Sequence, residues 1–129
     1  ADATGNYAIV EYCYGDNALT PDRMEVYTDN DTLRCVTNFY VSPSMKGHLD
    51  GWGSTHGRKR YEIMRSTLQD QNYSLSDSEA MNLLQSVAQT PGEELTSMTQ
   101  WSAVYNLTEK SMRLAILREY GKQFDFKVE

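Results

Sequence analysis

The sequence has only two cysteines, Cys13 and Cys35, too few for a disulfide-stabilised scaffold. Their separation matches no zinc-binding spacing, so we expect both to be buried free thiols, the usual state of such cysteines. Positive charge is also scarce. The formal net charge is -6, which argues against nucleic acids and anionic membranes as partners, because both attract clustered lysine and arginine.

Long apolar runs are missing as well. No stretch approaches the roughly 20 apolar residues of a membrane-spanning helix, and residues 1–6 are small and polar, unlike a secretory signal peptide. We therefore expect no membrane contact and favour a cytoplasmic location. With 40% apolar and 23% charged residues among 129, the composition predicts a single globular domain over residues 1–129.

Short segments with the composition or alternation of β-strands lie in the first and last thirds of the chain. They are residues 6–14, 23–28, 32–38, 99–107, 111–119 and 123–128. In the first of them both alternating sets of side chains are apolar, which predicts a strand covered on two faces. The last three alternate more clearly, with Trp101 and Tyr105 on one side of their strand.

Two segments between the strands have helical spacing. Residues 59–69 carry apolar side chains at this spacing, and residues 75–89 form the clearest helix, where Ser76 and Glu79 complete a capping box. The glycine-rich residues 42–57 predict a long loop. The order of three strands, two helices and three strands predicts an α+β fold, in which an antiparallel sheet carries an antiparallel helix pair on one face.

Motifs for a bound metal, a bound phosphate or a serine nucleophile do not appear in the sequence. His48 and His56 flank Asp50 in the glycine-rich stretch, but their spacing matches no zinc signature. We therefore expect no metal site and no cofactor. The Gly-x-Ser-x-Gly motif and the phosphate-binding loop are both missing, so serine hydrolysis and nucleotide binding are unsupported.

Asn38 and Arg60 are the candidate functional residues. Asparagine is uncommon in strands, and Asn38 ends the third predicted strand, where a side chain can reach the edge of a sheet. A side-chain amide there is a neutral donor suited to stabilising the oxyanion of an acyl-transfer reaction. The alternative is structural: Asn38 caps the loop, and Arg60 is a solvated charge at the start of a helix. Composition alone favours the structural interpretation.

The segments "DATGNYAIVEY" and "VTN", a loop that ends in Arg60 and Tyr61, and the segment "TQWSAVYNL" follow one another in this order. This order resembles the choloylglycine hydrolase group of linear-amide C–N hydrolases. The group includes conjugated bile-acid hydrolases, penicillin V acylase and the related acyl-coenzyme A:isopenicillin acyltransferases. The resemblance covers nearly the whole chain, as the C-terminal portion of a longer enzyme. It implies part of an α-β-β-α sandwich of the N-terminal-nucleophile type.

By this resemblance Asn38 helps to form the oxyanion hole, Arg60 lies beside the nucleophile, and Tyr61 packs under the helix. The family's nucleophile is a cysteine at the mature N-terminus, whose own α-amino group is the base. Here the sequence departs from the family, because it starts with Ala1. We therefore expect two partners, a small-molecule amide substrate and the remainder of the enzyme that carries the N-terminal cysteine. The isolated chain should be inactive.

A second class of function stays open at this stage. The acidic charge and the missing nucleophile favour a stand-alone, non-catalytic α+β module that binds a ligand or a partner. Hydrolysis and acyl transfer are equally compatible with the resemblance. Half of a four-layer sandwich leaves one apolar sheet face without its partner layer, so we also expect the chain to form a homo-oligomer.

Overall fold

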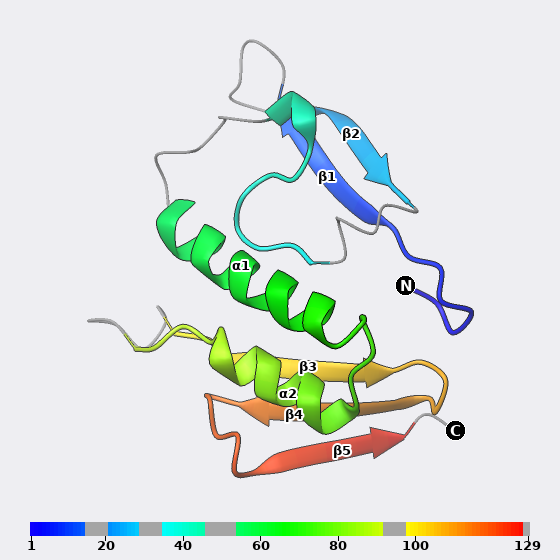
Figure 1. Ribbon diagram of the computed structural model, residues 1–129, viewed down its shortest axis with the longest axis vertical. Helices are drawn as coiled ribbons and strands as arrows, with labels where there is room; N and C mark the ends of the chain where they lie inside the picture. Colours follow the sequence, from blue (N-terminus) through cyan, green and yellow to red (C-terminus); the bar gives the residue numbers. More distant parts are fainter. Residues whose placement is uncertain (15–20, 29–34, 46–53, 92–97, 128–129) are drawn as a thin grey trace. The chain divides into compact units, whose positions relative to one another are not determined.

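The computed structural model describes residues 1–14, 21–28, 35–45, 54–91 and 98–127. Its elements are β1 (Ile9–Tyr14), β2 (Pro21–Tyr27), the 3-10 helix η2 (Pro43–Met45), α1 (Ser54–Asp70), α2 (Asp77–Ser86), β3 (Trp101–Asn106), β4 (Ser111–Ile116) and β5 (Gln123–Lys127) (Figure 1). The chain divides into two compact units, Ala1–Arg65 and Ser66–Glu129. The predicted α+β class with antiparallel strands is confirmed. Within the described ranges, no helix has both the length and the apolar character needed to cross a bilayer.

The first unit contains a two-stranded sheet made by β1 and β2. The strands pair antiparallel, with Ile9 opposite Tyr27 and Tyr12 opposite Met24. Successive side chains alternate between the two faces, and Cys13 is fully buried whereas Val10 and Tyr12 are exposed. The prediction that this strand is covered on both faces is therefore wrong, because one face is open.

The third predicted strand, residues 32–38, does not form in its described part. Residues 35–38 have no regular secondary structure, and residues 32–34 lie outside the described ranges. The chain that follows is held by a side chain instead of a strand ladder: the Glu11 carboxylate accepts hydrogen bonds from the backbone N–H groups of Val41 (2.9 Å) and Ser42 (2.8 Å). Because the carboxylate accepts from both backbone N–H groups, no neighbouring strand is required to satisfy them.

Both cysteines are free thiols, as predicted. Cys13 is buried next to Ser42, with 3.5 Å between Sγ and Oγ, and Met45 of η2, whose backbone N–H donates to the Ser42 carbonyl oxygen at 3.1 Å, is also buried. Cys35 is only half-buried, so the prediction that both thiols are buried is wrong for Cys35. The first unit therefore has a modest core in which a thiol and a hydroxyl satisfy one another.

Both predicted helices form, with different bounds. α1 begins at Ser54, inside the stretch predicted as a loop, and α2 ends at Ser86, well before the predicted residue 89. The capping box is confirmed. The Ser76 hydroxyl accepts the Glu79 backbone N–H at 3.3 Å, and the Glu79 carboxylate accepts the Ser76 backbone N–H at 2.8 Å. Reciprocal capping of this kind satisfies two backbone donors that a helix start otherwise leaves open.

The second unit is a three-stranded antiparallel sheet in the order β3-β4-β5, with α2 lying over β3 and β4 (Figure 1). The sheet and the helix share a core of Met81, Ala115 and Tyr120, against which Leu84 and Val104 pack. The strands of this unit and the β1–β2 pair form two separate sheets. The prediction of one sheet carrying both helices is therefore wrong: the described strands form two sheets, and α2 packs against the second of them.

Candidate functional site

The two residues singled out in the sequence, Asn38 and Arg60, are in direct contact. Arg60 Nη2 donates a hydrogen bond to Asn38 Oδ1 at 2.7 Å. A guanidinium carries only donors, so the amide oxygen must be the atom that faces it. The orientation of the Asn38 side chain is thereby set, with its amide nitrogen Nδ2 directed away from Arg60. Arg60 therefore binds the Asn38 side chain directly. The resemblance placed Arg60 beside the nucleophile and did not predict this contact.

Gly57 allows Asn38 to lie against α1. A Cβ atom at position 57 would lie 2.5 Å from Asn38 Oδ1 and 3.2 Å from its Cγ, so any larger residue would force the Asn38 amide to move. The Thr37 hydroxyl donates to the Gly57 carbonyl oxygen at 3.0 Å, so the backbone next to Asn38 is held to the same turn of the helix. Sequence reasoning missed Gly57, because a glycine in a glycine-rich stretch is typical of a loop.

Aromatic contacts hold the residue after Asn38. The Phe39 ring meets the Tyr61 ring edge to face, with 5.2 Å between the centroids. The Arg58 guanidinium lies 5.7 Å from the centroid of the Phe39 ring, within the range of a cation–π contact. Tyr61 therefore contacts the segment that carries Asn38, and together these contacts limit how far Asn38 can move relative to Arg60.

Asn38 lies at the edge of an open hollow of about 390 Å³ in the first unit. The residues that line it come from β1 and from the chain around Asn38: Val10, Glu11, Tyr12, Thr37, Asn38, Phe39 and Tyr40. Its volume falls within the range of small-molecule sites, about 300–1,000 Å³. Aromatic and aliphatic side chains form most of the wall, which suits a largely apolar ligand.

The polar side chains of this hollow differ in what they already bind. The Glu11 carboxylate and the Thr37 hydroxyl are engaged with backbone groups, whereas Asn38 Nδ2 has no acceptor among the described residues. Burial raises the pKa of the Tyr40 phenol, so this side chain stays protonated at neutral pH. The hollow therefore offers neutral donors beside an apolar wall, an arrangement that fits a carbonyl oxygen.

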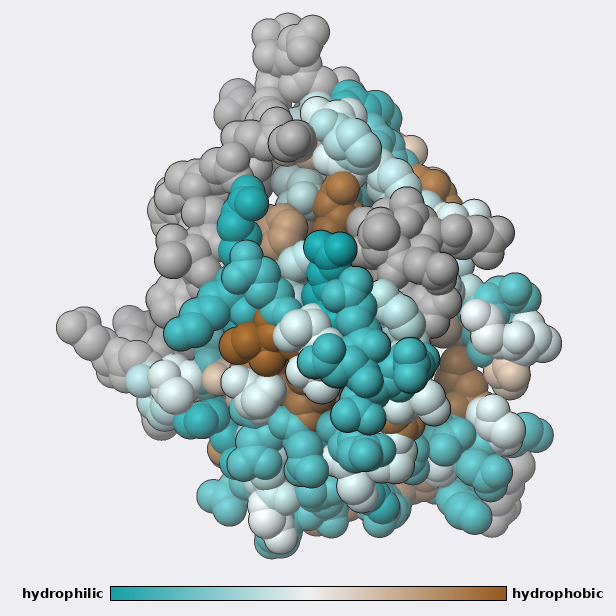
Figure 2. Space-filling view, viewed as in Figure 1, coloured by the Kyte–Doolittle hydropathy of each residue, from teal (hydrophilic) through white to brown (hydrophobic). Residues whose placement is uncertain are grey.

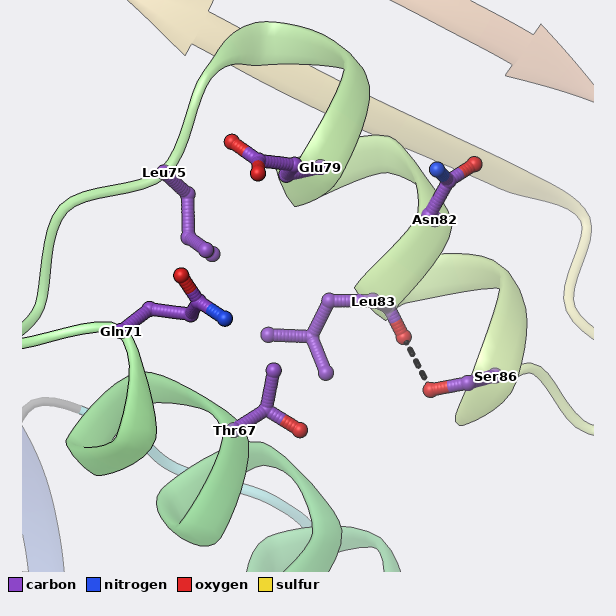
Figure 3. A pocket seen from close by; sticks show the side chains of 7 residues that line it. All are labelled: Thr67, Gln71, Leu75, Glu79, Asn82, Leu83 and Ser86. Atoms are coloured by element: carbon purple, nitrogen blue, oxygen red, sulfur yellow. Dashed lines mark hydrogen bonds between the residues drawn. The ribbon is translucent and has the colours of Figure 1, made fainter.

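Two further hollows in the second unit are less suited to a ligand. One of about 270 Å³ lies between the end of α1 and α2, where Leu83 points toward Thr67 (Figure 3). Its Glu79 carboxylate belongs to the capping box, and its Ser86 hydroxyl donates to the Leu83 carbonyl oxygen at 2.8 Å. In the other, of about 460 Å³, Arg113 is paired with Asp125 at 2.8 Å. In both, these polar groups are committed to the fold.

Metal ligands and activated nucleophiles do not gather at this site. Among the residues that the structure describes, no cluster of histidine, cysteine and carboxylate side chains could hold a metal. His48, Asp50 and the His56 side chain lie outside them. Burial raises the pKa of the Cys35 thiol, and Cys13 is buried. A raised pKa keeps a thiol protonated and therefore weakly nucleophilic.

A comparison with known proteins finds no relative: no family model, no curated protein and no solved structure matches this chain. Its function is therefore inferred from the geometry of the site and from the resemblance in segment order.

Proposed function

We propose that this chain supplies the carbonyl-binding part of a hydrolase, or related acyltransferase, that acts on linear amide C–N bonds. Asn38 donates its Nδ2 hydrogen to the substrate carbonyl oxygen, which becomes negative when a thiolate attacks the carbon. The observation that carries the proposal is the 2.7 Å hydrogen bond from Arg60 to Asn38 Oδ1. This hydrogen bond engages the amide oxygen, so the amide nitrogen of Asn38 is the atom that can bind a ligand.

Physical chemistry supports this role for a fixed amide. A donor stabilises an oxyanion most when it is already oriented, because no reorganisation is then needed during the reaction. Arg60 provides that orientation from α1, and Gly57 leaves the space for it. The apolar walls of the adjoining hollow suit the acyl part of an amide substrate, whose bulk is hydrocarbon.

The attacking thiolate comes from elsewhere in this proposal. Neither Cys13 nor Cys35 carries a free α-amino group, which the resembling family uses as its base. The remainder of the enzyme provides the N-terminal cysteine and completes the α-β-β-α sandwich. The thiolate forms a C–S bond to the carbonyl carbon as the C=O π electrons move to oxygen. When the intermediate collapses, the C–N bond breaks, and the amine leaves with the proton that the α-amino group took from the thiol. Water or an acceptor amine then attacks the thioester carbonyl, the C–S bond breaks, and the thiol is released with a proton.

The first test uses the chain itself, with penicillin V and a glycine-conjugated bile salt as probes. We expect no release of 6-aminopenicillanic acid or glycine, because the thiol and its amine base are missing. We expect binding to shift the side-chain amide signals of Asn38 in a nitrogen–proton NMR spectrum. Turnover that is lost on replacing Cys13 or Cys35 would overturn the assignment of the nucleophile to another part of the enzyme.

Substitutions then separate a donor from a structural cap. Asn38→Asp keeps an oxygen for Arg60 but removes the amide donor, so ligand binding should be lost while stability is unchanged or higher. Arg60→Ala should weaken binding by releasing the amide, and Lys59→Ala, an exposed cation on the same helix, is the matched control. Unchanged binding by Asn38→Asp would mean that Asn38 only caps the loop.

In the assembled enzyme the same donor should appear in the rate constant. An interaction that strengthens in the transition state changes turnover more than binding of the ground state. We therefore expect Asn38→Ala to lower kcat by about 10²–10³, with little change in KM. Arg60→Ala should impair both substrate binding and turnover.

The second candidate, a non-catalytic binding module, is favoured by one observation: neither described cysteine has the environment of a reactive thiolate. It predicts the same binding at Asn38 without turnover in any assembly. The genomic reading frame separates the two. An upstream segment with a cysteine that can be processed to the N-terminus supports the enzyme, and its absence supports the module.

A further inference from the structure

One face of the β3-β4-β5 sheet is apolar and uncovered. Side chains alternate along each strand, and α2 packs against the face that contains Val104 and Ala115. The opposite face presents four aromatic residues that remain exposed. Their exposed fractions are 63% for Trp101, 62% for Tyr105, 40% for Phe124 and 48% for Phe126.

Strand pairing makes this face continuous. It consists of eight side chains in three cross-strand rows, Trp101–Ile116, Ala103–Leu114–Phe124 and Tyr105–Met112–Phe126, called the apolar face below. Directly opposed side chains on neighbouring strands lie about 4.5–5.5 Å apart at Cβ, so the rows have no polar gap between them. The result is one contiguous patch and not a scatter of single exposed hydrophobic residues.

The charged residues of the same strands lie on the other side. Arg113 pairs with Asp125 across β4 and β5, and Lys127 alternates to the side of Asp125. The surface on the α2 side is mainly hydrophilic (Figure 2). At the rim, the Lys122 ammonium lies 5.8 Å from the Phe124 ring centroid. The apolar face itself carries no formal charge.

We propose that the apolar face binds the same face of a second copy of this chain, packed about a two-fold axis. The area supports a dimer. A whole aromatic residue buries about 150–250 Å², so the exposed parts of these four offer about 400 Å². The aliphatic members raise this to about 600 Å², the upper end of what a monomer leaves exposed. Stable interfaces bury about 600–1,000 Å² on each partner, so the apolar face reaches the lower end of that range.

A second copy fits this face for electrostatic and geometric reasons. A two-fold contact places the same patch of both copies against each other. Charged residues in the patch would then repel their copies, whereas an uncharged patch causes no such repulsion. Two sheets pack face to face about 10 Å apart, with side chains interdigitating. Ala103, small and central among larger neighbours, leaves room for a side chain of the partner. Nucleic acids and anionic membranes would instead require positive charge.

The test is the size of the full chain by light scattering, from low micromolar to near millimolar concentration. We expect a shift from one to two copies with increasing concentration. In the Trp52→Phe variant Trp101 is the single tryptophan, because the chain has two. Its emission should move to shorter wavelength over the same range as water leaves the indole.

Two substitutions locate the contact. Tyr105→Thr keeps a strand-forming residue but removes an aromatic anchor, and it should weaken association at least about thirtyfold. Tyr12→Thr, an equally exposed tyrosine on the β1–β2 sheet, is the matched control and should leave association unchanged. Far-UV circular dichroism checks that both variants fold. If Tyr105→Thr does not fold, the Trp101 titration decides.

A chain that stays monomeric throughout, with constant Trp101 emission, would overturn the proposal. So would a dimer that Tyr12→Thr weakens and Tyr105→Thr does not. The proposal concerns this chain without the remainder of the enzyme, whose sandwich layer would cover the same face. Its failure and that of the proposed function are distinguishable, because ligand binding at Asn38 is measured separately in the first unit.

Discussion

Replacing Gly57 by alanine tests the packing of Asn38 against α1 most directly. In an ordinary helix this change is stabilising by about 0.5–1 kcal/mol, because glycine loses more conformational freedom on folding. Here the new Cβ would lie 2.5 Å from Asn38 Oδ1. The Asn38 side chain has to rotate away, which breaks its hydrogen bond with Arg60. A hydrogen bond to a charged group at an exposed site contributes about 1 kcal/mol.

The two effects should nearly cancel in the natural background. Gly57→Ala is thus expected to change the free energy of unfolding by less than about 0.5 kcal/mol. In the Asn38→Ala background the obstructing oxygen is gone, and the nearest remaining atom, Phe39 Cδ1, is at 3.4 Å, an ordinary contact. The same substitution should then stabilise by the full 0.5–1 kcal/mol or so.

Urea unfolding of the four proteins in this double-mutant cycle measures the coupling. We expect an interaction energy of about 1 kcal/mol between the two positions. An equal gain from Gly57→Ala in both backgrounds would refute the close approach of Asn38 to the helix. The Asn38 side-chain amide signals should also move in Gly57→Ala without any ligand, because the amide loses its fixed orientation.

Three further predictions concern the rest of the fold. Hydrogen bonds from the hydroxyls of Ser44 and Tyr27 lower the pKa of Glu25 from 4.5 to about 2. The ionised Glu25 side chain therefore stabilises the fold fully above pH 4.5, and this stabilisation is lost as the pH falls toward 2. As the pH falls from 4.5 toward 2, the urea midpoint of the Glu25→Gln variant should therefore decrease less than that of the natural chain. Equal decreases in the two proteins would contradict this prediction. Ser76→Ala removes half of the capping box and should cost about 1 kcal/mol in urea unfolding, with Ser74→Ala as the control. Tyr120→Phe leaves the buried Ser102 hydroxyl without its 2.9 Å partner, and it should cost about 1–3 kcal/mol, part of which Ser102→Ala restores in the double variant.

The sequence alone was enough for features that depend on near neighbours along the chain. The capping box of Ser76 and Glu79 was predicted and is present, because both hydrogen bonds join residues three positions apart. Strand-like composition located the segments that became β1 and β2, alternation located β3 to β5, and helical spacing located α1 and α2, because each of these signals reports local geometry. Asn38 and Arg60 were singled out in the sequence with separate roles by resemblance; their direct contact was not predicted, and their catalytic roles stay a prediction.

Tertiary structure decided which partner each of these elements meets. Alternation shows that β3 has two sides but does not predict which side α2 covers. In the structure α2 covers the side that contains Ser102, and Trp101 on the other side stays exposed. Residues 35–38 have strand-like composition, yet they form no strand, because Thr37 and Asn38 bind α1 and the following backbone binds Glu11. A helical Gly57 was equally invisible, since its role is to leave space for a side chain that is distant along the chain. Contacts between residues far apart in the sequence set these outcomes, and a local pattern carries no information about them.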